Sequence, residues 1–247
     1  MGETTGFLDR PGGERLAWRK LAGAGPTVVW LGGFRSDMTG TKAQALAEWA
    51  AQAGRAYVRF DYFAHGESSG DFRQGTITRW REDALAVLDD LAPGPVTLVG
   101  SSMGGWIACL AALARPQRVR ALVLVAPAAD FTDKLISPRL DAAARGALAT
   151  DGVWLEPSDY GEPNPITARL LEDGARWSIL PGPVPIAVPV RILQGGQDDA
   201  VPWRHALDLA QAIKGDDVVF TLIKDGDHRL SRPQDIERLV AAVAETA

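Results

Sequence analysis

The chain has 247 residues, a formal net charge of −5 at pH 7 and one cysteine. This length fits a single α/β domain with a large buried core, and a mildly acidic chain without a basic stripe argues against nucleic-acid binding. The lone Cys109 excludes an internal disulfide, and the sequence has no apolar run approaching the roughly 18 residues of a membrane span. Residues 1–6 lack the basic start and apolar core of a secretory signal, so we expect a soluble cytoplasmic protein.

The predicted elements alternate between strands and helices along the chain. A β-hairpin over 7–21 comes first, a capping box at 41–44 opens a helix that ends near Gly54, and a second helix is expected over 77–91. The core strands are apolar runs over 27–31, 56–60, 96–99, 121–125, 190–193 and 218–223. Continuous apolar strands between helices predict an α/β fold with a mostly parallel central sheet covered on both faces.

The stretch over 128–188 breaks this alternation, because it is rich in proline and lacks a core strand. A structureless loop of that length is improbable inside a compact domain. We therefore expect an inserted cap over about residues 129–187, with short helices over 137–149 and 164–174, inside one domain spanning 1–247.

A strand–turn–helix pattern surrounds Ser102. The segment Gly100-Ser101-Ser102-Met103-Gly104 follows an apolar strand directly and opens into a helical pattern. In this setting the G-x-S-x-G sequence is typical of a nucleophile elbow, whose strained turn exposes the serine hydroxyl at the carboxyl edge of a sheet. We predict that Ser102 is a nucleophile; the alternative is a glycine-rich turn with an idle serine.

A serine nucleophile needs a base, and the chain holds three histidines. His228 follows the strand over 218–223 on a polar loop, at the sheet edge where α/β proteins gather reacting groups. His65 fits a loop residue that makes hydrogen bonds, and His205 fits a surface residue near a helix start. We therefore predict His228 as the base.

Two neighbouring carboxylates follow the strand over 190–193. We favour Asp198, where the chain leaves the strand, as the acid that orients the imidazole, and expect Asp199 to face solvent or to cap the next helix. If neither serves, Asp130 after the strand over 121–125 is the remaining candidate. The resulting order of serine, aspartate and histidine differs from that of chymotrypsin and subtilisin.

With these motifs the chain resembles the α/β-hydrolase superfamily across nearly its whole length. Three segments match its acid loop, histidine loop and oxyanion segment: Gly195-x-x-Asp198-x-x-Val201-Pro202, Gly226-Asp227-His228 and Gly32-Gly33-Phe34. Many relatives carry histidine where this chain has Leu31-Gly32-Gly33, but a backbone donor there does not depend on the side chain. The residues 33–43, 59–62, 100–106 and 197–202 more narrowly resemble the mitochondrial palmitoyl-protein thioesterase branch, which also cleaves an acyl-glucuronide.

The resemblance implies a serine hydrolase that cleaves carboxylic esters or thioesters through a Ser102–His228–Asp198 triad and an acyl-enzyme intermediate. The backbone N–H groups of Met103 and Phe34 are the expected oxyanion donors. No cofactor is required, and no metal site is expected, because the histidines and the cysteine lack zinc-ligand spacing. The expected partner is a small-molecule ester or thioester, or an acylated protein, while the oligomeric state is left open.

Four further residues are candidates for substrate contacts. Arg35 adjoins the predicted oxyanion donor, so its cation either meets a substrate carboxylate or pairs with Asp37 or a cap carboxylate. Trp154, Tyr160 and Trp177 either line a pocket under the cap or pack the cap onto the sheet.

Other functions remain open at this point. One is a ligand-binding protein with little turnover, because fold alone does not settle function. The other is a lactonase, C–C bond hydrolase or acyltransferase that uses the same three residues.

Overall fold

The computed structural model describes residues 2–157 and 162–247, and within them eight strands form one sheet in the order β1-β2-β4-β3-β5-β6-β9-β10. The strands are β1 (Thr4–Asp9), β2 (Arg15–Leu21), β3 (Ala24–Leu31), β4 (Arg55–Phe60), β5 (Val96–Ser101), β6 (Val119–Val125), β9 (Val190–Gly195) and β10 (Val218–Ile223). The first hairpin β1–β2 and the β2–β4 pair are antiparallel, and every other pair is parallel. The predicted α/β fold with a mostly parallel sheet is confirmed.

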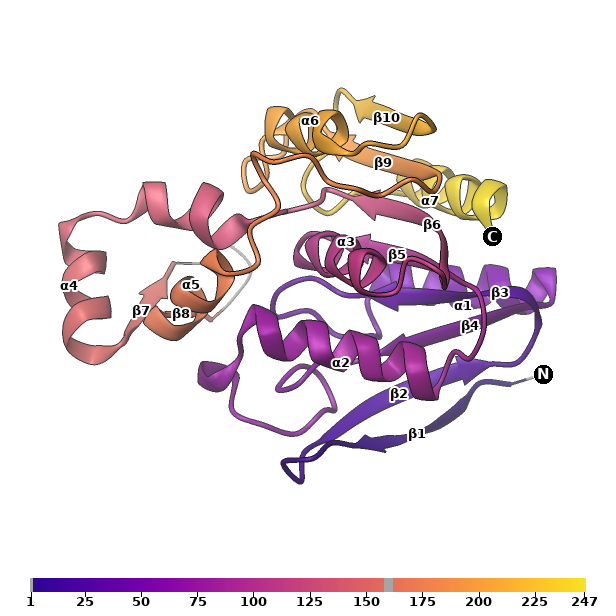
Figure 1. The fold of residues 1–247 in the computed structure, drawn as a ribbon, viewed down its shortest axis with the longest axis horizontal. Helices are drawn as coiled ribbons and strands as arrows, with labels where there is room; N and C mark the ends of the chain where they lie inside the picture. The colour runs from indigo at the N-terminus through magenta and orange to yellow at the C-terminus, as the bar shows by residue number, and fades with distance from the viewer. Residues whose placement is uncertain (1, 158–161) are drawn as a thin grey trace.

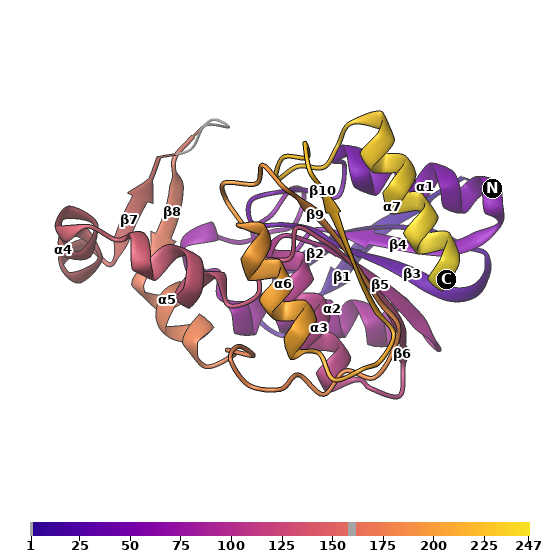
Figure 2. The same cartoon turned by 90° about the horizontal axis from the view of Figure 1, so that it is seen from above.

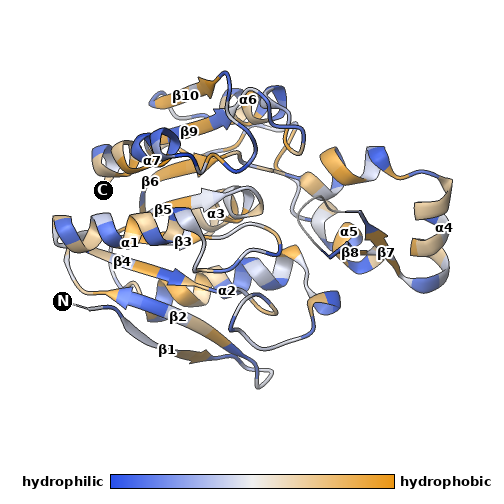
Figure 3. Cartoon of the chain, turned by 180° about the vertical axis from the view of Figure 1, so that it is seen from behind, coloured by the Kyte–Doolittle hydropathy of each residue, from blue (hydrophilic) through white to orange (hydrophobic). Residues whose placement is uncertain are grey.

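Helices cover both faces of the sheet (Figures 1 and 2). One face carries α1 (Thr41–Ala53) and α7 (Pro233–Thr246), and the other carries α2 (Ile77–Asp90), α3 (Met103–Ala114) and α6 (Trp203–Ala212). Each face has its own hydrophobic cluster. Figure 3 shows mostly apolar residues on β3, β4 and β6 and a mixture of polar and apolar residues on α1 and α7, as expected where strands are buried on both faces and helices on one.

The start of α1 differs from the predicted capping box. The N-cap is Gly40, which makes no side-chain cap hydrogen bond, and Thr41 is already the first helical residue. The Gln44 N–H donates to the Gly40 carbonyl oxygen at 3.0 Å, so the helix begins one residue earlier than the box requires.

The cap segment, residues 129–187, connects β6 to β9 and protrudes beside one end of the sheet (Figure 1). It contains the short helical turns Thr132–Ile136 and Ser137–Arg139, then α4 (Ala142–Asp151), β7 (Val153–Glu156), β8 (Asn164–Thr167) and α5 (Ala168–Ala175). The predicted helix over 164–174 is wrong at its start, because 164–167 pair antiparallel with β7. A proline at position 165 is tolerated there because β7 and β8 form a two-stranded sheet whose strands are both edges.

One buried carboxylate joins the two ends of the cap segment. Asp130 is 1% exposed and accepts hydrogen bonds from Ser178 Oγ at 2.7 Å, Ile179 N at 3.0 Å and Leu180 N at 2.7 Å. His205 Nε2 lies 2.7 Å from the carbonyl oxygen of Ala129 on the same junction. The Asp130 carboxylate therefore joins the start of the cap segment to residues 178–180 near its end.

Candidate active site

The nucleophile elbow lies between β5 and α3. Ser102 has φ 55°, a left-handed conformation that is strained for a non-glycine residue, and it is the N-cap of α3. A Cβ atom on Gly100 would lie 2.3 Å from the Gly104 carbonyl oxygen, and one on Gly104 would lie 2.0 Å from the Leu31 carbonyl oxygen. The two glycines are therefore required by close backbone contacts on either side of the serine.

The structure brings Ser102, His228 and Asp198 together. His228 Nε2 lies 3.1 Å from Ser102 Oγ, and His228 Nδ1 lies 2.8 Å from Asp198 Oδ2. The Asp198 side chain is fully buried, whereas the His228 side chain is 23% exposed. Strands β5, β9 and β10 deliver these residues from their carboxyl ends, which meet at one sheet edge.

Asp198 is held rigidly by further hydrogen bonds. Its Oδ1 accepts from Ala200 N at 3.0 Å and from Val201 N at 2.7 Å, and its Oδ2 accepts from Gln194 Nε2 at 3.0 Å. Asp199 is exposed and makes none of these contacts. Four donors, including the imidazole, thus hold the Asp198 side chain in one orientation.

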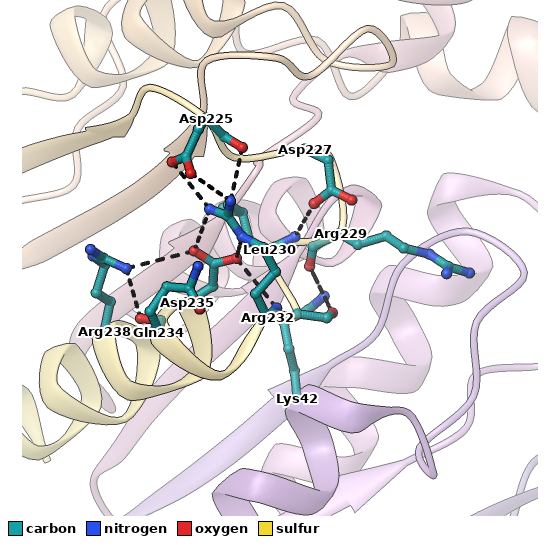
Figure 4. Close-up of polar contacts among 10 residues, drawn as sticks. Lys42, Asp225, Asp227, Arg229, Leu230, Arg232, Gln234, Asp235 and Arg238 are labelled. Carbon is teal, nitrogen blue, oxygen red and sulfur yellow. Dashed lines mark hydrogen bonds and ion pairs between the residues drawn. The ribbon is translucent and has the colours of Figure 1, made fainter.

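Ion pairs connect the loop that carries His228 to the start of α7 (Figure 4). Arg232 binds Asp225 at 2.8 Å and Asp235 at 2.7 Å, so its guanidinium joins the loop to the first turn of α7. Within the loop, Leu230 N donates to Asp227 Oδ1 at 2.9 Å.

Lys42 on α1 donates a hydrogen bond to the same loop (Figure 4). Its Nζ donates to the carbonyl oxygen of Arg229, the residue after His228, and lies 3.4 Å from Ser231 Oγ. Burial lowers the pKa of Lys42 to about 8, and the nearby Asp227 and Asp235 oppose this shift. Lys42 therefore links α1 to the histidine loop.

The segment Gly32-Gly33-Phe34, predicted to hold an oxyanion donor, passes close to Ser102. A Cβ on Gly33 would lie 3.4 Å from Ser102 Cβ, and Phe34 follows directly. Met103 is the first residue of α3, so its N–H has no intrahelical acceptor. The Phe34 ring packs against Phe72 and Trp80, with ring centroids 5.0 and 5.8 Å away.

Arg35 contacts the cap segment. Its Nη1 donates to the backbone carbonyl oxygens of Pro163 at 2.7 Å and Glu162 at 3.0 Å. Of the two alternatives for Arg35, the salt bridge to Asp37 or a cap carboxylate does not form within the described residues; the Arg35 cation instead bonds the main chain of the cap segment and lies 3.5 Å from Asn164 Oδ1. Arg35 also lines the pocket described next.

A pocket of about 650 Å³ lies between the sheet edge and the cap segment. Ser102 and His228 line it, and so do Phe34, Met103, Arg35 and Lys42. The cap segment contributes an apolar wall formed by Phe131, Leu135, Ile136 and Ile166, and it also contributes polar residues to the lining: Arg139, Glu156, Glu162 and Asn164.

The cap tryptophans lie outside this pocket lining. Trp177 Nε1 donates to Thr78 Oγ1 at 2.7 Å, and the Arg81 guanidinium carbon lies 4.4 Å from the Trp177 ring centroid. Trp154 is half-buried and packs against the main hydrophobic cluster. Both therefore pack the cap segment in place, and Tyr160 lies outside the described residues.

Sequence analysis missed Gln194, Lys42 and Leu135. Gln194 left a signal in the sequence, because a polar amide directly after an apolar strand needs hydrogen-bond partners if the strand is buried. In the structure Gln194 is fully buried. Lys42 left a signal only as a member of the resembling stretch 33–43, and Leu135 left none, since a leucine in a cap is ordinary.

Over residues 2–157 and 162–247, no three histidine, cysteine, aspartate or glutamate side chains gather as metal ligands. In the same part of the chain, no helix has both the length and the apolar character needed to cross a bilayer.

The fold and a serine at the elbow define a serine hydrolase of the α/β-hydrolase superfamily. Residues 26–167 match the family described as serine aminopeptidase, S33, and the chain belongs to this family. A relative from Bos taurus, mitochondrial palmitoyl-protein thioesterase ABHD10, is 40% identical over 239 residues, which cover 96% of this chain and 78% of that relative. The predicted resemblance to this branch is confirmed.

Solved structures agree with this assignment. A protein from Agrobacterium vitis S4 is 46% identical and has a TM-score of 0.96, with 100% of this chain and 99% of that chain covered. Mouse alpha/beta hydrolase domain-containing protein 10 is 36% identical and has a TM-score of 0.90, with 98% and 97% covered.

Proposed function

We propose that this protein hydrolyses carboxylic esters or thioesters with Ser102 as nucleophile, His228 as base and Asp198 as the acid that orients it. The observation that carries the proposal is the continuous hydrogen-bonded chain from Ser102 Oγ through the imidazole to Asp198. The buried carboxylate favours the tautomer with hydrogen on Nδ1, which leaves Nε2 free to accept the serine proton.

Acylation forms the bond between Ser102 Oγ and the carbonyl carbon and breaks the bond between that carbon and the leaving alcohol or thiol. His228 Nε2 takes the proton of Ser102 Oγ as the oxygen attacks the carbonyl carbon, and the carbonyl π electrons move onto oxygen. The N–H groups of Met103 and Phe34 donate to this oxyanion, each contributing roughly 3 kcal/mol. When the tetrahedral centre collapses, the alcohol or thiol leaves with the proton from His228.

Deacylation repeats these steps with water. His228 removes a proton from water, the hydroxide attacks the acyl-enzyme, and the second collapse returns the proton to Ser102 Oγ as the acid departs. No other co-reactant is needed.

The apolar cap wall supports an acyl group as the part of the substrate that lies under the cap segment. Its relatives' name, palmitoyl-protein thioesterase, supports the same choice. A small-molecule ester or thioester and an acylated protein both fit this proposal. A cytoplasmic location stays a prediction, and the name of the relatives places those proteins in mitochondria.

The test is activity profiling with p-nitrophenyl esters and acyl thioesters of graded chain length, together with labelling by a fluorophosphonate. Ser102→Ala and His228→Ala should each lower turnover by several orders of magnitude while the fold survives. The probe should label the wild type and Cys109→Ala, which controls for the only thiol, and should leave Ser102→Ala unlabelled. Equal labelling of Ser102→Ala would overturn the nucleophile, and a folded wild type inert to every substrate and to the probe would favour a binding protein.

A further inference from the structure

A second histidine lies beneath the oxyanion segment and has no part in the chemistry above. His65, in the loop after β4, is 3% exposed. Its ring packs among Tyr62, Phe72 and Trp80, with ring centroids 5.1 to 5.7 Å away. Such an apolar surrounding, with no carboxylate from the described residues against the ring, disfavours the imidazolium.

The hydrogen bonds of His65 define its tautomer. Nδ1 lies 3.0 Å from the Phe63 carbonyl oxygen, which can only accept, so Nδ1 carries the hydrogen. The other nitrogen, Nε2, accepts the backbone N–H of Arg35 at 3.2 Å. Burial lowers the pKa of His65 to about 4; the hydrogen bond to Phe63 opposes this shift and the Arg35 cation contributes to it, so the neutral ring is the form present near neutral pH.

The residue that His65 holds is under backbone strain. Arg35 has φ 56°, in the left-handed region where a non-glycine side chain costs roughly 1–2 kcal/mol. Its amide belongs to the peptide that follows Phe34, the proposed oxyanion donor. The Phe34 ring packs on Phe72 and Trp80, the same two rings that contact His65.

We propose that His65 is a positioning residue for the oxyanion hole. Through the Arg35 amide, its Nε2 holds the peptide after Phe34 in the left-handed turn, and so directs the Phe34 N–H at the site where charge develops on the substrate. The inference rests on the proposed ester or thioester hydrolysis.

Two substitutions separate the two hydrogen bonds of the ring. The Gln Oε1 is four bonds from Cα, as is His Nε2, so His65→Gln can still accept from Arg35. The Asn Nδ2 is three bonds from Cα, as is His Nδ1, so His65→Asn can donate to Phe63 but does not reach Arg35. Both variants lose the aromatic ring, which makes each the packing control for the other.

We expect His65→Asn to lower kcat about 10- to 100-fold with KM within threefold of wild type, because misplacing an oxyanion donor by about 1 Å weakens only transition-state binding. His65→Gln should stay within about fivefold of wild type. The affinity for a trifluoromethyl ketone, whose hemiketal oxygen occupies the oxyanion hole, should fall in His65→Asn by the same factor as kcat/KM.

Equal losses in the two variants, or a His65→Asn enzyme with wild-type kcat, would overturn the proposal. If neither variant folds, the imidazole ¹⁵N spectrum of the wild type decides: a neutral ring with hydrogen on Nδ1 supports it, and hydrogen on Nε2 refutes it. Ser102 labelling by a small fluorophosphonate in wild type tests the proposed function separately, so the two ideas fail in different experiments.

Discussion

Asp198 and Asp199 are neighbours in the chain but lie in different environments. Asp198 is buried against His228 and three protein donors, and Asp199 is exposed. We expect Asp198→Asn to lower kcat by roughly 10³-fold or more, because an amide at this position favours the wrong imidazole tautomer. Asp199→Asn, the matched control, should stay within about twofold. Steady-state kinetics on a p-nitrophenyl ester gives the ranking, and the reverse order would move the acid to Asp199.

Lys42 offers a second prediction for a single residue. Lys42→Met keeps the apolar stem and removes the donor to the Arg229 carbonyl oxygen, so the histidine loop should sample more conformations. We expect kcat on a small neutral ester to fall about 3- to 10-fold with KM unchanged, as a misplaced base lowers the rate of the chemical step. Lys224→Met is the control, because Lys224 is exposed on the same loop. A change in KM alone would indicate that Lys42 contacts substrate and does not position His228.

At the level of elements, the cap segment contributes an apolar wall to the pocket. Leu135→Ala removes part of this wall, and remote binding of this kind alters selectivity between chain lengths. We expect kcat/KM for a long acyl ester to fall about tenfold, with a short ester nearly unchanged, since burying a leucine side chain contributes about 1.5–3 kcal/mol. Leu155→Ala is the control, because Leu155 is 53% exposed on β7. If the ratio of kcat/KM for the long ester to kcat/KM for the short ester does not change in Leu135→Ala, the apolar wall does not bind the acyl chain.

Most elements of the sheet could be predicted from sequence, because buried parallel strands such as β5 are apolar on both faces and helices repeat every 3.6 residues. The hairpin β7–β8 could not, because four-residue strands are too short to show a period, and Pro165 argues against a strand.

That Ser102, His228 and Asp198 lie together could also be predicted, because each follows a recognisable strand. The pocket wall could not, since it depends on how the cap segment packs. Trp177 is aromatic and half-buried as expected, yet its indole N–H is directed to Thr78 on α2. The partners of Arg35 could not be predicted either, because no residue spacing in the sequence indicates hydrogen bonds to backbone carbonyl oxygens of the cap segment.

For the whole molecule, the junction at Asp130 should matter to stability. Asp130→Ala leaves the half-buried Ile179 N–H and the buried Leu180 N–H without their acceptor, each at a cost of about 1–3 kcal/mol. We expect the free energy of unfolding to fall by about 2–4 kcal/mol and Tm by roughly 4–16 °C, given about 2–4 °C per kcal/mol for a chain of this size. Calorimetry against Asp133→Ala, an exposed neighbour, checks this. If folded Asp130→Ala had normal stability but no activity, Asp130 would have a catalytic role instead.

The buried Asp83 predicts a pH-dependent stability. Burial raises its pKa from 3.8 to about 6, although Phe63 N donates to it and Arg10 lies 3.5 Å away. The folded state therefore binds this proton more tightly, so the stabilising contribution of Asp83 is complete below pH 3.8 and is lost as pH rises through about 6.

Replacing Asp83 with asparagine removes this titration and keeps an acceptor for Phe63 N. We expect the difference in unfolding free energy, variant minus wild type, to rise by about 2–3 kcal/mol between pH 4 and pH 7. Denaturant unfolding at several pH values measures it, with Asp90→Asn, exposed on the same helix, as the control. A difference independent of pH would show that Asp83 does not titrate in this range.

The contact between Arg35 and the cap segment has a consequence for how this enzyme can diverge. Arg35 donates hydrogen bonds to main-chain carbonyl oxygens, which every amino acid carries. These two hydrogen bonds therefore do not depend on which side chains stand at positions 162 and 163. Substitutions of Glu162, which lines the pocket, can alter what the pocket admits while the hydrogen bonds of Arg35 beside the oxyanion segment remain. New substrate preferences can therefore arise in the cap while the reacting groups keep an inherited alignment.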